Sequence, residues 1–193
     1  MGIGMAMVGW IAENIAMIIF FGVIDSRFHI LPFISPYALI IPAFYLAIGD
    51  PDDFTFFGLK LFKERSLRNT VLSNIVTIVF IFAAVFFGEL ATGSALEALF
   101  GVELWDYSAQ PFALKYAGLI PMLGYGLMAY GILKLIYKPV LDLMQKKMNY
   151  KLAKVITLTL GVAIVLDTTF LLIYMGVTGV KPEYWMIRLF SYS

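Results

Sequence analysis

The chain has no cysteine and a single histidine, and charged residues make up only 14% of its 193 residues. The absence of cysteine excludes disulfides, thiol catalysis and thiolate metal sites. A single histidine excludes a metal site built from several imidazoles. We therefore expect no metal and no cofactor.

Apolar residues, in contrast, are abundant, at 61% of the chain. A soluble protein of this length could not bury so much apolar surface, so the solvent must be lipid. The net charge of +1 gives no basis for nucleic-acid binding. The N-terminal stretch MGIGMAMVGW lacks the basic flank of a signal peptide, and we expect it to begin a retained helix. The composition predicts an all-α integral membrane protein with the lipid bilayer as its first partner.

Five apolar runs have the roughly 20 residues that a helix needs to cross a bilayer. They cover residues 3–24, 30–49, 70–95, 112–136 and 154–177. Pro42 is central in the second run and should kink that helix. We predict five transmembrane helices in a single membrane domain, residues 1–193.

Lysine and arginine gather in the second and fourth connections between these runs. Residues 50–69 hold four and residues 137–154 hold five, whereas residues 89–114 hold none. Because basic loops stay in the cytoplasm, we expect a multi-pass protein of the cell membrane with its N-terminus inside and its C-terminus outside. Two segments should lie along the membrane surface, residues 54–66 at the inner face and the tail 178–193 at the outer face.

The chain carries an internal repeat. Shifted by 79 positions, residues 9–42 match residues 88–121 at 12 of 34 positions without a gap, including Phe-Gly-Val at 21–23 and 100–102. Similar apolar composition does not explain matched prolines at fixed spacing, so self-similarity at one period indicates duplication. We predict two tandem parallel helix hairpins, residues 9–47 and 88–126, plus a fifth helix. Substrate sites of repeat-built transporters lie at the repeat interface.

Three carboxylates fall inside the predicted spans: Glu13, Glu89 and Asp167. Ionisable groups at such depth cost about 2.5–3.5 kcal/mol and usually face a bundle interior or a water-filled cavity. In the repeat register Glu13 falls on Thr92, and Glu89 lies nearly one helical turn earlier, on a similar face. We predict a central polar site, which consists of Glu13, Asn14, Glu89, Thr92 and Asp167. The alternative is a set of buried polar anchors that only fix helix packing.

A second group of candidates lies at the outer end. Arg27 falls on Asp106 under the same shift, and the two could form a latch or an ordinary exposed ion pair worth under about 1 kcal/mol. Trp105 and Tyr107 suit the aromatic belt of the interface. His29 is assigned to the corner between the first two helices, with proton transfer as the alternative. These five residues form the predicted outer gate.

Two blocks of motifs carry a family resemblance. The first contains GWIAE (9–13), Arg27, LPF (31–33) and SPY (35–37), and the second contains ELATG (89–93), LFG (99–101), LWDYS (104–108) and LIYKPV (135–140). In these blocks the chain resembles the ABC-transporter type IV family of small multi-pass membrane proteins, which also has an animal transmembrane branch. The resemblance implies a membrane protein of transport type and names no substrate.

Three functions remain open on the sequence. The first is a transporter or permease-like protein whose paired buried carboxylates line a path at the repeat interface. The second is a membrane-embedded enzyme, such as a hydratase or cyclase, whose buried acids donate protons to a lipid or isoprenoid. The third is a non-catalytic subunit, which would have a membrane-protein partner or form a homo-oligomer. No catalytic residue can be assigned, since no phosphate loop, nucleophile elbow or metalloprotease motif is present.

Overall fold

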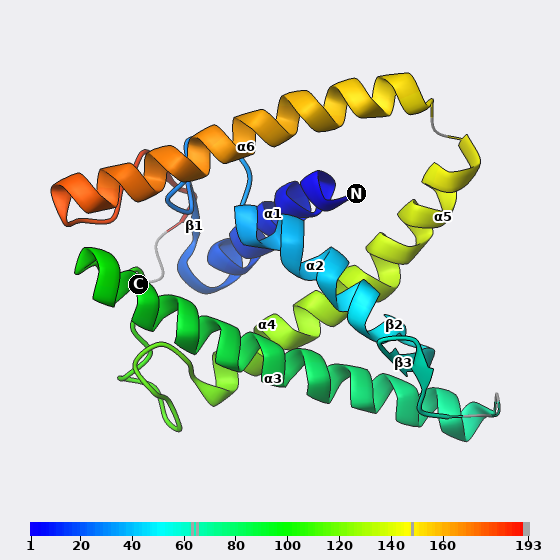
Figure 1. Cartoon of the computed structure of the whole chain (residues 1–193). Helices are drawn as coiled ribbons and strands as arrows, with labels where there is room; N and C mark the ends of the chain where they lie inside the picture. Colours follow the sequence, from blue (N-terminus) through cyan, green and yellow to red (C-terminus); the bar gives the residue numbers. More distant parts are fainter. Residues whose placement is uncertain (63, 65, 148, 191–193) are drawn as a thin grey trace. The chain divides into compact units, whose positions relative to one another are not determined.

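The computed structural model describes residues 1–62, 64, 66–147 and 149–190, so the predicted surface segments 54–66 and 178–193 lie partly outside it. The described chain is mostly helical, with five short strands (Figure 1). It divides into two compact units. Unit 1 consists of Met1–Leu39 and Lys146–Ser193, and unit 2 consists of Ile40–Gln145.

Four helical stretches are long and apolar enough to cross a membrane. They are α1 (Gly2–Phe21), α3 (Leu67–Phe100), Leu119–Lys146, and α6 (Tyr150–Thr178). The third runs through α4 (Leu119–Gly131), the π-helical η1 (Ile132–Tyr137) and most of α5 (Lys138–Lys147). A membrane protein of several apolar helices is therefore what the chain forms, as the sequence predicts.

The predicted second span contains a shorter helix, α2 (Ser35–Ile48), of 14 residues. At 1.5 Å per residue it is about 21 Å long, less than the roughly 30 Å hydrocarbon core. Pro36 stands in its first turn, where the missing N–H costs nothing, and Gly49 follows its end with φ 67°. These signals make the helix shorter than the apolar run. The count of five spans therefore stays a prediction.

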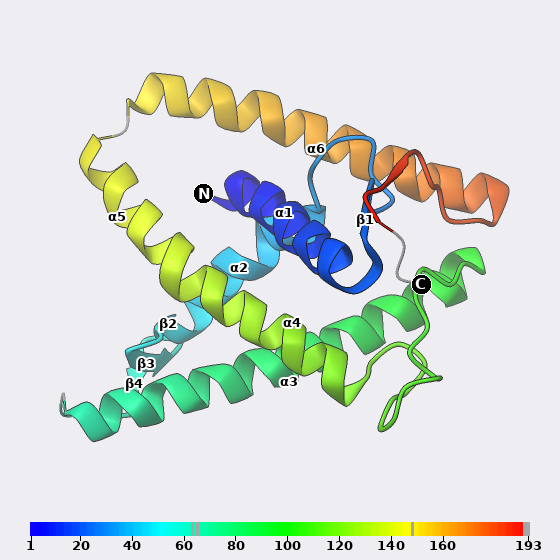
Figure 2. The same ribbon diagram turned by 180° about the vertical axis from the view of Figure 1, so that it is seen from behind.

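Unit 1 is built on α1 and α6. Ala6, Phe33 and Ile164 form its core, and Ile3 reaches Gly161, where a Cβ would be 3.6 Å from the isoleucine side chain. The strand β1 (Val23–Asp25), after α1, pairs antiparallel with β5 (Met186–Arg188), after α6. Figure 2 shows the red tail beside β1. The C-terminal ends of α1 and α6 therefore lie at the same end of unit 1.

Unit 2 is built on α3 and α4. Gly126 on α4 lies so close to the α3 backbone that a Cβ there would be 3.2 Å from the Cα of Phe82. Three strands, β2 (Gly49–Asp50), β3 (Asp53–Phe56) and β4 (Leu59–Lys60), form a small antiparallel sheet. Phe54 and Phe56 of β3 pack their rings on Phe80 of α3. The sheet contains part of the predicted inner-face segment.

Candidate functional site

Glu13 is the central charged residue of unit 1. It lies in α1 with a side chain only 13% exposed, and both of its carboxylate oxygens are used. Arg27 donates from Nε to Oε2 at 2.8 Å, and its Nη2 lies 2.7 Å from the same oxygen. The Tyr37 hydroxyl donates to Oε1 at 3.1 Å. The carboxyl group inside an apolar span is thereby paired with a guanidinium and a hydroxyl.

The turn after α1 returns Arg27 to Glu13. The side chain of Asn14, only 4% exposed, donates to the Trp10 carbonyl and accepts the Asp25 N–H at 2.8 Å. The Asp25 carboxylate in turn accepts the N–H of Arg27, which has φ 51°. Such short-range side-chain bonds are typical of Asx turns. Asn14 therefore positions the turn that places the guanidinium.

A second buried pair joins the corner after β1 to α6. The Nδ1 atom of His29 lies 2.8 Å from Oδ2 of Asp167, and the Ile30 N–H donates to Oδ1 at 3.0 Å. The two side chains are 7% and 5% exposed. Asp167 therefore holds the corner through both of its oxygens, and a predicted central residue meets a predicted outer one.

The C-terminal tail covers this region of unit 1. The ring of Trp185 contacts that of Trp10 at 6.1 Å, and its carbonyl accepts the N–H of Ser26. The ring of Tyr184 contacts Phe170 of α6. Burial, and then the negative charge of Asp167, raise the pKa of the Tyr184 hydroxyl, so that it stays protonated.

Three buried polar atoms of unit 1 have no hydrogen-bond partner among the described residues. They are Nε1 of Trp10, Oγ1 of Thr168 and Oη of Tyr184. Buried polar groups without a protein partner usually bind water or a ligand. In the buried ion pairs of unit 1, Glu13 and Asp25 share the Arg27 guanidinium and Asp167 pairs with His29, so three carboxylates have one permanently charged partner. This composition favours a cation or a proton over an anion.

Unit 2 contains a closely similar arrangement around Glu97. The Tyr116 hydroxyl donates to Oε2 of Glu97 at 2.5 Å, and the Lys115 ammonium lies 2.6 Å from Oε1. The ring of Tyr116 lies on Gly93, four residues before Glu97, as the ring of Tyr37 lies on Gly9, four residues before Glu13. In both cases a Cβ on the glycine would be 2.4 Å from the ring. Glu97 is not among the site residues predicted from the sequence, although Gly-x3-Glu followed by Pro-Phe-x3-Tyr occurs in both places.

The other outer residues surround Lys115 and Tyr116. Trp105 donates from Nε1 to the Tyr116 carbonyl at 3.1 Å, and the Tyr107 N–H donates to the Lys115 carbonyl. Glu103 lies 2.5 Å from the Lys115 ammonium. Glu103 and Glu97 therefore raise the pKa of Lys115, which stays charged. This group is a partly exposed ion cluster beside the C-terminal end of α3.

Asp106 caps its own turn, since its carboxylate accepts the Ser108 N–H at 2.7 Å. Bonds from Ser108 lower the pKa of Asp106. Its predicted partner Arg27 belongs to unit 1 and pairs there with Glu13 and Asp25. Glu89 and Thr92 lie on α3 in unit 2, whereas Glu13 lies in unit 1. The predicted pairs Arg27–Asp106 and Glu13–Glu89 each join residues of different units and stay predictions.

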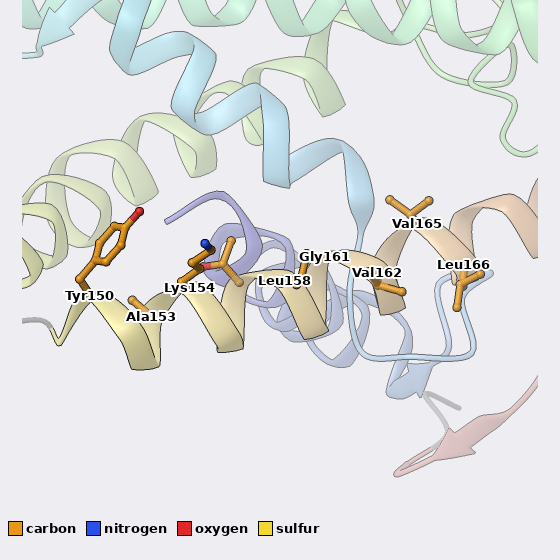
Figure 3. A pocket seen from close by; sticks show the side chains of 9 residues that line it. Tyr150, Ala153, Lys154, Leu158, Gly161, Val162, Val165 and Leu166 are labelled. Atoms are coloured by element: carbon orange, nitrogen blue, oxygen red, sulfur yellow. The ribbon is translucent and has the colours of Figure 1, made fainter.

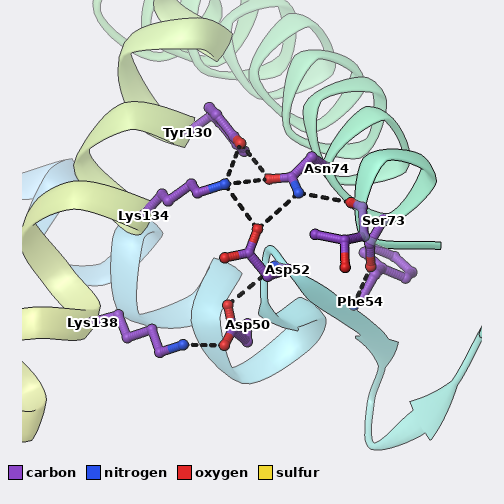
Figure 4. A network of polar contacts seen from close by, with 9 residues as sticks. Asp50, Asp52, Phe54, Ser73, Asn74, Tyr130, Lys134 and Lys138 are labelled. Atoms are coloured by element: carbon purple, nitrogen blue, oxygen red, sulfur yellow. Dashed lines mark hydrogen bonds and ion pairs between the residues drawn. The ribbon is translucent and has the colours of Figure 1, made fainter. Parts of the chain in front are cut away.

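A separate polar network in unit 2 fixes the small sheet to two helices (Figure 4). Lys134 of η1 donates to Asp52 at 2.8 Å and to Asn74 of α3 at 2.9 Å, and Tyr130 also bonds Asn74. Lys138 pairs with Asp50. The Lys134 bond lowers the pKa of Asp52. The π-helical turn that supplies Lys134 precedes Pro139, which has no N–H for a regular helical bond.

An open groove of about 700 Å³ runs along α6 in unit 1 (Figure 3). Its lining comes from one face of α6, from Tyr150 to Leu166, and is mostly apolar, with Lys154 near one end. Such a face suits lipid chains. In the described ranges no group of three His, Asp or Glu side chains is placed to hold a metal ion.

Comparison with known proteins identifies a family. The model of a family described as "Putative ABC-transporter type IV" matches residues 3–172, which cover most of the chain and leave out the C-terminal tail. No curated protein and no solved structure matches. The family match confirms the resemblance that the two motif blocks indicate.

Proposed function

The chain belongs to the ABC-transporter type IV family, and from this premise we propose that it is a permease-like membrane protein whose working site is the polar cluster of unit 1. The cluster consists of Glu13, Arg27, Tyr37, His29 and Asp167. The observation that carries the proposal is Glu13 itself, a carboxylate held inside an apolar helix by a guanidinium and a hydroxyl. Intramembrane ionisable residues commonly mark substrate or ion pathways. The excess negative charge of the cluster favours a cationic solute.

We further propose that the chain crosses the membrane five times, with α2 as the second crossing. The pairing of β1 with β5 sets the ends of α1 and α6 on one side of unit 1. If α1 and α6 both cross, the chain must pass from that side to the other between them, which takes an odd number of crossings. The long stretches Leu67–Phe100 and Leu119–Lys146 supply two. The third would then be α2, and the basic connections support an N-terminus on the inside.

The internal repeat remains part of the proposal, with a more specific correspondence. Gly22 and Gly101, 79 residues apart, each end a helix in the left-handed conformation, at φ 68° and 66°. Tyr37 and Tyr116, also 79 residues apart, each bond a glutamate that follows a glycine by four positions. These matched contacts support Glu97 as the counterpart of Glu13. Each half would then contribute one tyrosine-held carboxylate.

Flux through the purified protein tests the proposal. The full chain is reconstituted into liposomes, and efflux of Rb⁺, methylammonium and a neutral sugar is measured. We expect efflux of at least one cation, and Glu13→Gln should slow it by about tenfold or more. Asp142→Asn, the same carboxylate-to-amide change at an exposed position, should leave the rate unchanged.

Two results would contradict the proposal. One is the absence of flux for all three probes, which would favour the membrane-enzyme or subunit hypotheses. The other is an equal rate for wild type and Glu13→Gln, which would leave the carboxylate with a packing role only.

A further inference from the structure

Within the proposed working site, His29 and Asp167 form a buried ionisable pair whose own role the proposed cation path does not specify. His29 is the only histidine of the sequence. It reaches from the corner before α2 to Asp167 on α6, with 2.8 Å between Nδ1 and Oδ2. We propose that this pair is a proton-binding site and that the proton exchanged there drives transport. The coupling part of this inference rests on the proposed function, whereas proton binding by the pair does not.

The geometry leaves one ring nitrogen for the exchanged proton. When Nδ1–H donates to Asp167, Nε2 is the nitrogen that takes up and releases a proton. The step forms one N–H bond and breaks one O–H bond of a hydronium ion, and the reverse step breaks the N–H bond and re-forms the O–H bond. Histidine is the side chain whose ordinary charge change falls between pH 5 and 8. Uptake changes the pair from one net negative charge to none, which reduces the cost of its burial.

Two other carboxylates of unit 1 have an ion-pair partner of their own, so proton uptake at the pair is assigned to His29 and Asp167. The titratable side chains of unit 1 on the elements around the pair are Glu13 on α1, Asp25 on β1, Arg27 in the corner, Tyr37 on α2, Tyr150, Lys151, Lys154 and Tyr174 on α6, and Lys181, Glu183, Tyr184 and Arg188 in the tail. Glu13 and Asp25 already share Arg27. Among the residues that the structure describes, His29 is the side chain that forms an ion pair with Asp167.

Buried polar groups of unit 1 that have no hydrogen-bond partner among the described residues provide binding positions for water. Thr168 follows Asp167 in α6, and the hydroxyl of Tyr184 is close enough for the Asp167 charge to affect it. Both hydroxyls are buried and have no partner in the described part of the chain, as is the indole N–H of Trp10. Waters bonded to such groups would carry a proton between the pair and the end of unit 1 that the tail covers.

The single histidine makes proton binding directly measurable. In the full chain, labelled with ¹⁵N-histidine, all ring nitrogen signals come from residue 29. We expect these signals to change from the neutral to the charged form between pH 5 and 8, and to change over a different pH range in Asp167→Asn. A ring that keeps one form over this whole interval would overturn the inference, whatever the transport assays show.

Proton movement provides the second test. Liposomes that contain the full chain and the pH dye pyranine are given a membrane potential with K⁺ and valinomycin. We expect proton uptake in wild type and a loss of about tenfold or more in His29→Asn. The asparagine amide still donates a hydrogen bond to Asp167 but carries no exchangeable charge. Asp142→Asn should match wild type.

The outcomes separate this inference from the proposed function. An unchanged proton rate in His29→Asn would assign the histidine a packing role and overturn the inference. Cation efflux without any proton movement would overturn proton coupling and leave the proposed function standing. Absence of all cation efflux with a titrating ring would overturn the proposed function and leave proton binding standing.

Discussion

The ring of Tyr37 lies directly on Gly9, so that a Cβ built on the glycine would be 2.4 Å from two ring atoms. Gly93 has the same relationship to Tyr116. In both cases the tyrosine hydroxyl then reaches the glutamate one helical turn further along. The absence of a side chain on each glycine is therefore what allows the tyrosine to bond the carboxylate.

Alanine at these glycines is expected to destabilise the fold. The added methyl overlaps a closely packed tyrosine ring, and overpacking of this kind costs about 1–3 kcal/mol. Gly9→Ala and Gly93→Ala should each lower the midpoint of thermal unfolding in detergent. Gly88→Ala is the matched control, because its Cβ would meet nothing within 4 Å. Since alanine favours helix by about 0.5–1 kcal/mol over glycine, the control should be neutral or stabilising. Equal melting of Gly93→Ala and Gly88→Ala would contradict the close packing.

Replacing one partner of the buried pair Glu13–Arg27 should lower the free energy of unfolding more than replacing both partners. Arg27→Met leaves an uncompensated carboxylate, and loss of one partner of a buried pair costs about 3–5 kcal/mol. The double variant Glu13→Gln/Arg27→Met removes both charges and should recover much of that loss. Denaturant unfolding of the singles and the double gives the coupling energy.

An exposed pair provides the comparison. Lys60 pairs with Asp53 at 2.7 Å, but its side chain is 55% exposed. Lys60→Met should therefore cost under about 1 kcal/mol. If Lys60→Met and Arg27→Met lower the free energy of unfolding by the same amount, Glu13 is better solvated than its 13% exposure indicates.

The helices of this protein are predictable because each long apolar run exceeds what a span needs. Predicted runs 3–24, 70–95 and 154–177 correspond to α1, α3 and α6. The prediction from the second run, 30–49, is less accurate, because Pro36 and Gly49 set the ends of α2 inside this run. Apolar composition reports the solvent of a segment, whereas local backbone chemistry sets where its helix begins and ends.

The site is predictable in its members and less so in its pairings. Glu13, Arg27, His29 and Asp167 are all predicted site residues, but His29 is predicted in the outer gate and Asp167 in the central polar site. They meet because the corner after β1 folds back on α6, a long-range contact that no local pattern encodes. Polar residues in a span are visible in the sequence, but their partners depend on tertiary packing.

Glu97 was missed for a different reason. In α1, the glycine under the tyrosine ring, Gly9, precedes the glycine that ends the helix, Gly22, by 13 positions. In α3, Gly93 precedes Gly101 by eight positions. An ungapped shift of 79 aligns the helix ends and the tyrosines, and so misaligns the glutamates. A gapped comparison would have paired Glu97 with Glu13.

The network around Lys134 should make stability depend on acid pH. Because the Lys134 bond lowers the pKa of Asp52, the carboxylate stabilises the fold above the ordinary aspartate value of about 3.9. This contribution is lost as the pH falls through the lower folded value. The unfolding midpoint of wild type should exceed that of Asp52→Asn at pH 7 and 5, and the difference should shrink below about pH 4. Since Asp52 is 45% exposed, the effect should stay under about 1 kcal/mol. Asp142→Asn should show no such dependence, and a difference that grows in acid would contradict the sign.

The absence of cysteine makes the proposed topology testable with single cysteines and no background substitutions. Ile30 and Leu59 lie before and after α2, and their side chains are 51% and 75% exposed. If α2 crosses, an impermeant maleimide should label Ile30→Cys in intact cells and Leu59→Cys only after permeabilisation. Ala109→Cys and Glu183→Cys should behave like Ile30→Cys, and Gln145→Cys like Leu59→Cys. Labelling of Ile30→Cys and Leu59→Cys from the same side would show that α2 turns back within the membrane. The pairing of β1 with β5 would then require α1 or α6 not to span, because two crossings between them would bring the chain to α6 on the side where α1 ends.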